Sequence, residues 1–126
     1  MVTWILWALI LAMLAWMGFN YLRIRRAAKI VDNEEFEALI RTGQLIDLRD
    51  PAEFHRKHIL GARNIPSSQL KTSLAALRKD KPVLLYENQR AQRVTNAALY
   101  LKKQGFSEIY ILSYGLDSWK GKVKTN

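Results

Sequence analysis

The chain opens with a long apolar run and continues with short apolar segments separated by polar ones. The stretch from Val2 to Leu22 contains no charged side chain. As an α-helix rising 1.5 Å per residue, it would be about 32 Å long, which matches the hydrocarbon core of a bilayer. The pattern therefore predicts one transmembrane helix over residues 1–22.

The charges beside this run indicate its orientation. A cleaved signal peptide carries positive charge before its apolar run, whereas here Arg23, Arg25, Arg26 and Lys29 follow it. Residues 23–31 are thus expected to form a basic juxtamembrane linker. By the positive-inside rule the chain would cross the cell membrane once, with its N-terminus outside and its C-terminal domain in the cytoplasm.

Residues 32–126 have the pattern of one folded domain. Asp32 followed by Glu35 forms a capping-box pattern, and Gly43 is placed to end the helix that follows it. Apolar runs predict strands at 45–48, 64–65, 83–86 and 109–112, and helices are expected at 52–57, along Leu70, Leu74 and Leu77, at 94–103 and, as a short turn or helix, at 115–120.

The order of these elements defines a fold class. Strands alternate with helices, which predicts an α/β domain with an open, mainly parallel sheet and helices on both faces. Residues 83–86 read Val-Leu-Leu-Tyr without polar alternation, as in a strand covered on both sides, so this strand is expected at the centre of the sheet.

Several spaced motifs resemble the rhodanese-like domain family. They are the stretch 45–49 with Asp47 and Arg49, the stretch 58–66 with His58 and Gly61, the strand 81–86, and the segments 101–106 and 109–119. The resemblance covers residues 28–121. It implies that Asp47, Arg49, His58 and Gly61 are structural residues of that fold, with Asp47 and Arg49 forming an ion pair or hydrogen bonds.

The resemblance also locates the expected active-site loop. In that family a nucleophilic cysteine follows the central strand and an arginine closes the loop. The corresponding residues here are Glu87, Asn88, Gln89, Arg90, Ala91, Gln92 and Arg93. Counting forward from Tyr86 puts Glu87 in the cysteine's place, whereas counting back from Gly105 puts Asn88 there.

The chain contains no cysteine at all. Thiolate catalysis, persulfide transfer and cysteine-ligated metals are therefore excluded, and the loop is expected to be catalytically degenerate. At such a loop, backbone N–H groups converge above a helix start and favour an anion. Glu87 either fills this nest with its own carboxylate or points to solvent, and both alternatives stay open here.

Other chemistries find little support in the sequence. His55 and His58 lie three residues apart, but no further ligand has suitable spacing, so no metal and no cofactor are expected. The net charge is +9, yet beyond the juxtamembrane cluster the basic residues are scattered, which argues against nucleic acid as a partner.

The predicted function is a binding or scaffolding module held at the cytoplasmic face of a membrane, with the lipid bilayer and another protein as its partners. Exposed loops at the carboxyl ends of strands favour residues 87–93 as the interface. The alternative is a non-catalytic subunit of a sulfurtransferase, in which a partner supplies the cysteine and this chain contributes Arg93 and the loop backbone.

Overall fold

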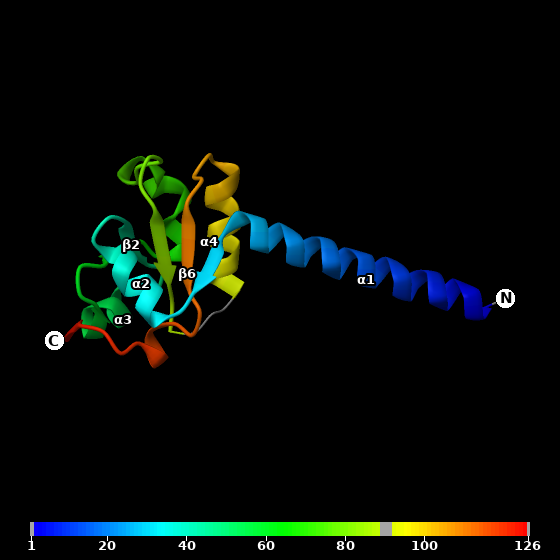
Figure 1. Ribbon diagram of the computed structural model, residues 1–126, viewed down its shortest axis with the longest axis horizontal. Helices are drawn as coiled ribbons and strands as arrows, with labels where there is room; N and C mark the ends of the chain where they lie inside the picture. The colour runs from blue at the N-terminus through cyan, green and yellow to red at the C-terminus, as the bar shows by residue number, and fades with distance from the viewer. Residues whose placement is uncertain (1, 89–91, 126) are drawn as a thin grey trace.

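A long N-terminal helix projects from an α/β domain (Figure 1). The structure is a computed structural model that describes residues 2–88 and 92–125, with only the backbone described at 24–27 and 92. Its α-helices are α1 (Val2–Ala27), α2 (Asn33–Ile40), α3 (Pro51–Arg56) and α4 (Gln92–Lys103). Its 3-10 helices are η1 (Ser67–Gln69), η2 (Lys71–Ala76) and η3 (Leu116–Ser118).

The main sheet is parallel throughout and has the order β1-β6-β5-β2-β4. Its strands are β1 (Lys29–Val31), β2 (Gln44–Asp47), β4 (Arg63–Asn64), β5 (Val83–Tyr86) and β6 (Ile109–Leu112). The strand β5 lies at the centre, as predicted from its unbroken apolar run, and all four of its residues are buried. The predicted α/β fold with a mainly parallel sheet is confirmed.

Each face of the sheet carries its own hydrophobic core. Successive side chains of a strand point to opposite faces, so Val83 and Leu85 belong to one core and Leu84 and Tyr86 to the other. The first core is covered by α4, η1 and η2, and the second by α2 with η3. In the second core the Phe36 ring meets the ring of Tyr86 edge-on, with centroids 6.5 Å apart.

The helix α2 begins where the capping box predicts. The Asp32 side chain accepts a hydrogen bond from the Glu35 backbone N–H at 2.9 Å, which satisfies a donor that the first helical turn leaves free. The helix ends near Gly43, whose backbone N–H donates to Leu39 O. A side chain at Gly43 would collide with Leu84, so the glycine is needed for packing against β5.

The expected linker over residues 23–31 has a different structure from the one predicted. The helix α1 continues through the basic residues to Ala27, and Lys29–Val31 then pair with β6 as strand β1. Buried Ala28 joins the two. The stretch Val2–Arg23 of α1 is long and apolar enough to cross a membrane, and it is not buried against the domain.

Two further features differ from the sequence prediction. The segment containing Leu70, Leu74 and Leu77 forms the 3-10 helices η1 and η2 and not one α-helix, and only Leu70 and Leu77 are buried. An unexpected second sheet joins β3 (Lys57–Ile59) to β7 (Val123–Thr125) in antiparallel pairing. This pairing attaches the end of the chain to the segment after α3.

Candidate functional site

Strand β2 ends in a buried ion pair between Asp47 and Arg49. The Arg49 guanidinium donates to both carboxylate oxygens of Asp47 over 2.8–3.1 Å, and the Arg49 backbone N–H donates to Asp47 Oδ1 at 2.9 Å. Asp47 is fully buried and Arg49 is 4% exposed. Burial acts to lower the pKa of Arg49, but the hydrogen bond and charge of Asp47 raise it overall, so Arg49 stays charged.

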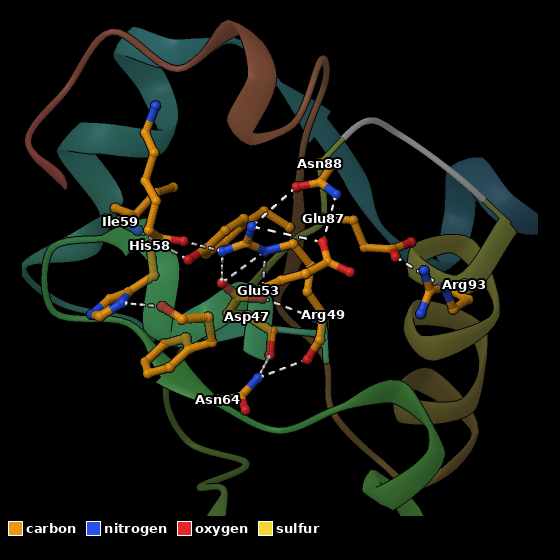
Figure 2. A network of polar contacts seen from close by, with 12 residues as sticks. Asp47, Arg49, Glu53, His58, Ile59, Asn64, Glu87, Asn88 and Arg93 are labelled. Carbon is orange, nitrogen blue, oxygen red and sulfur yellow. Dashed lines mark hydrogen bonds and ion pairs between the residues drawn. The ribbon is translucent and has the colours of Figure 1, made fainter. Parts of the chain in front are cut away.

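The same guanidinium reaches the neighbouring segments (Figure 2). Its Nη2 donates to the Lys57 carbonyl, at the end of α3, and its Nη1 donates to Asn88 Oδ1 at 3.0 Å. The Asn88 amide in turn donates to Glu53 Oε2 at 2.8 Å. Arg49 therefore holds Asn88 and the end of α3 at the carboxyl ends of β2 and β5.

Glu87 follows β5 directly, and its side chain is directed toward the first turn of α4 (Figure 2). The carboxylate is 4% exposed, and its Oε1 lies 3.1 Å from Arg93 Nε. The Arg93 side chain is 54% exposed. Of the two alternatives for Glu87, the one in which it points to solvent is therefore wrong.

The surroundings of Glu87 only partly balance its charge. Burial raises the pKa of this carboxyl, while Arg93 and the Val94 backbone N–H act to lower it. The second oxygen, Oε2, is buried without a hydrogen-bond partner among the described residues. Gln89, Arg90 and Ala91 lie outside the described residues, as does the Gln92 side chain, so the filling of a backbone nest by Glu87 stays a prediction.

Two other residues from the sequence motifs, His58 and Gly61, lie in the segment that follows α3. His58 Nδ1 lies 2.7 Å from Phe54 O, and its ring stacks on the Phe54 ring with centroids 3.8 Å apart. Gly61 has φ of 90°, a left-handed conformation that glycine adopts without a steric penalty. His58 lies in β3, so the spacing of His55 and His58 on one helix turn is not realised.

An open cleft of about 440 Å³ lies beside this network. Its lining residues, which come from α3, η3 and the ends of β2 and β5, are Arg49, Glu53, Arg56, Lys57, Asn88, Leu116 and Asp117. The mixture of basic and acidic groups suits a polar partner surface better than a small apolar ligand. Among residues 2–88 and 92–125, no three His, Asp or Glu side chains gather as a metal site.

Sequence reasoning brought some of these residues together and missed others. Asp47, Arg49 and Asn88 were all candidates, and they form one network. Glu53 was not a candidate, although it lies four residues after Arg49, a spacing at which helical side chains can meet. The contact from Arg49 to the Lys57 carbonyl has no sequence signal, because any residue supplies a carbonyl.

Comparisons with known proteins agree on one family. A family model for the rhodanese-like domain matches residues 32–122. The chain is 48% identical over 113 residues to the protein YqhL of Bacillus subtilis, covering 90% of this chain and 89% of that relative. It is 36% identical over 95 residues to the thiosulfate sulfurtransferase GlpE of Stutzerimonas stutzeri, covering 73% of this chain and 84% of that enzyme.

A solved structure gives the same result at the level of the fold. A rhodanese-related protein from Thermoplasma volcanium superposes with a TM-score of 0.70 at 23% sequence identity. The match covers 78% of this chain and 99% of that one. At this identity the likeness concerns the fold alone.

Proposed function

The chain belongs to the rhodanese-like domain family, and from this premise we propose that it is a membrane-tethered member without sulfurtransferase activity of its own. It acts as a module that binds another protein at the cytoplasmic face of the cell membrane. The thiosulfate sulfurtransferase activity in the name of GlpE belongs to that relative.

One observation carries the proposal. The residue that follows central strand β5 is Glu87, a buried carboxylate held against Arg93, and the whole chain has no cysteine. Sulfur transfer through a persulfide requires a sulfur nucleophile, which a carboxylate or an amide cannot replace. The chain therefore has the fold in which this chemistry occurs but lacks the sulfur atom that the reaction requires.

The cleft beside Asn88 supports a binding role. Arg49 and Glu53 already hold Asn88 in a fixed orientation, so a partner would meet a preorganised surface. Arg56 and Lys57 contribute positive charge to the lining of the cleft, and Asp117 contributes negative charge. A protein segment with both acidic and basic side chains fits this arrangement.

The apolar part of α1 and the basic residues after it support the tether and its orientation. Because the chain has no native cysteine, one introduced cysteine reports topology cleanly. In a Gln104→Cys variant, a membrane-impermeant maleimide should react only after the cells are opened. Reaction at the same rate in intact cells would place the domain outside.

A thiosulfate:cyanide transfer assay tests the lack of activity. The purified wild-type chain should show no turnover above a buffer control. Glu87→Cys and Asn88→Cys test which position corresponds to the nucleophile, and Glu34→Cys, at an exposed position of α2, controls for an unrelated thiol. Turnover by the wild-type chain would overturn the proposal.

Partner binding is tested by cross-linking in detergent-solubilised membranes. An Arg56→Glu and Lys57→Glu double variant should lose the cross-linked product, while Lys120→Glu with Lys124→Glu, of equal charge change, should keep it. Loss in both variants would argue against the cleft. Sulfur transfer that appears only with the captured partner would favour a non-catalytic sulfurtransferase subunit.

A further inference from the structure

The sheet face covered by α4, η1 and η2 differs in charge from the opposite face. Residues 54–79 and 88–107 contain no Asp or Glu, and η1, η2 and α4 lie within these stretches. The helix α2, which covers the other face, carries Glu34, Glu35 and Glu37 and no basic residue. The helices that cover the two faces of the sheet therefore carry opposite charge, acidic in α2 and basic in η2 and α4.

Four exposed lysines define what we call the basic face, namely Lys71, Lys79, Lys102 and Lys103. They come from different segments but lie around one helix. The Lys71 ammonium is 5.5 Å from the centroid of the Tyr100 ring in α4, and that of Lys79 is 5.9 Å from the Phe106 ring, just beyond α4. Lys102 and Lys103 are in the last turn of α4 itself.

Helix electrostatics explain only part of this arrangement. Cations in the last turn of a helix interact favourably with its dipole, which accounts for Lys102 and Lys103. Lys71 and Lys79 come from outside α4, so their position beside it has a different cause. The nearby acidic Asp80 is already paired with Arg78, at 2.6 Å.

The position of α1 turns this face toward the predicted bilayer. The helix α1 leaves the domain on the side covered by α4, and the C-terminal end of α1 contacts α4 (Figure 1). Since α1 is helical to Ala27, only about 7.5 Å of helix separates Leu22 from the domain. This distance is shorter than the Debye length of about 8 Å at physiological salt.

A cleft of about 260 Å³ lies within the same face, between η1, η2 and α4. Its lining includes Ser67, Ser68 and Lys71 together with the apolar residues Leu70 and Ala97 and the ring-bearing Tyr100. Two hydroxyl groups and an ammonium supply hydrogen-bond donors and charge that suit a phosphate ester oxygen. The face therefore offers both a diffuse positive field and a local recess.

We propose that the basic face binds anionic lipid headgroups and holds the domain against the cytoplasmic leaflet. The proposal rests on the membrane tether proposed above and adds an orientation to it. An anionic bilayer favours each nearby lysine enough to raise binding about fivefold, and the acidic helix α2 would be repelled from it. The cleft beside Asn88, on another part of the surface, would stay available to a protein partner.

Lysine reactivity tests this orientation in the full chain. The chain is placed in nanodiscs of phosphatidylcholine, with or without about a third phosphatidylserine, and modification by a water-soluble acylating reagent is followed by mass spectrometry. We expect about fivefold slower modification of the four basic-face lysines in the anionic discs, reversed by high salt. Lys57, Lys120, Lys122 and Lys124 are internal controls and should not change.

A second measurement uses a dye on Gln104→Cys and nitroxide-labelled headgroups in the anionic discs. Changing the four basic-face lysines to Gln should reduce the quenching, whereas changing the four control lysines to Gln, with the same loss of charge, should not. Both variants replace exposed side chains only. Matching melting curves would show that neither has unfolded.

Each contrary result has a distinct meaning. A chain that separates from the nanodiscs overturns both the tether and the lipid proposal. A chain that stays in the discs but shows equal lysine reactivity in both lipids overturns the basic face alone. Protection of the same lysines by polyglutamate in neutral discs, without any effect of phosphatidylserine, would assign the face to an acidic protein.

Discussion

Arg49 Nη1 donates to Asn88 Oδ1 over 3.0 Å, a contact that joins the carboxyl ends of β2 and β5 through one guanidinium. The same group neutralises Asp47, which is fully buried. Removal of a buried ionic partner leaves the other charge without compensation, which costs more than the pair itself contributes. Arg49 is therefore the residue whose loss the site tolerates least.

We predict that Arg49→Leu lowers the free energy of unfolding by about 3 kcal/mol, because Asp47 would stay buried without its partner. Thermal unfolding of the full chain in detergent, followed by circular dichroism, measures the change. Arg78→Leu is the matched control, since it removes an exposed ion pair with Asp80 and should leave the melting temperature unchanged. Equal effects of both changes would contradict the role given to Arg49.

The sequence predicted the parts of the fold that local chemistry determines. The capping residue Asp32 and the unbroken apolar run of β5 each indicate their element directly, and both are where the pattern placed them. The β3-β7 pair was missed because each strand has three residues, too few to show periodicity. Its register also depends on distant partners, such as Ile59 and Val123 or Lys57 and Thr125.

The helical prediction around Leu74 failed for a related reason. Leu70, Leu74 and Leu77 are spaced four and then three positions apart, which fits an α-helix. In the structure, however, the 3-10 helix η2 ends at Ala76, before Leu77. A short segment packed by two buried leucines gains little from the α-helical hydrogen-bond ladder, and 3-10 turns serve as connectors of this kind. Within the site, the burial of Glu87 depends on its contact with α4. The residues next to Glu87 in the sequence give no sign of that contact.

Gly43 gives a prediction about packing. A Cβ at this position would lie 2.1 Å from Leu84 Cδ1 and 3.1 Å from Leu39 O, so Gly43→Ala must displace a fully buried side chain of the central strand. We expect the free energy of unfolding to fall by about 1–3 kcal/mol. Gly18→Ala is the control, because nothing lies within 4 Å of its Cβ, and a similar loss there would point to a helix effect.

Tyr86 gives a prediction about a buried hydrogen bond. The backbone N–H of Ile59 donates to the Tyr86 hydroxyl at 3.1 Å, which connects β3 to the central strand. Tyr86→Phe would leave that N–H unpaired in the core and lower the free energy of unfolding by about 1–2 kcal/mol. Urea denaturation in detergent measures it, with exposed Tyr114→Phe as the control. No loss for Tyr86→Phe would show that the hydroxyl is dispensable.

Glu87 gives a prediction about pH. Burial raises the pKa of this carboxyl in the folded chain, so the folded state binds the proton more tightly than the unfolded state does. Stability then falls as pH rises from the unfolded-state pKa, about 4.3, through the raised folded-state value. At pH 7 Glu87→Gln should increase the free energy of unfolding by about 1 kcal/mol, and the gain should disappear toward pH 4.

Melting curves between pH 4 and pH 8 for Glu87→Gln, Arg93→Gln and the wild-type chain test the direction in which stability changes with pH. Arg93 acts to lower the pKa of Glu87, so Arg93→Gln should make the loss of stability with rising pH larger than in the wild-type chain. A Glu87→Gln chain that is less stable than wild type at pH 7 would contradict the prediction. It would mean that the carboxylate is satisfied as an anion, as in a loop whose backbone N–H groups it fills.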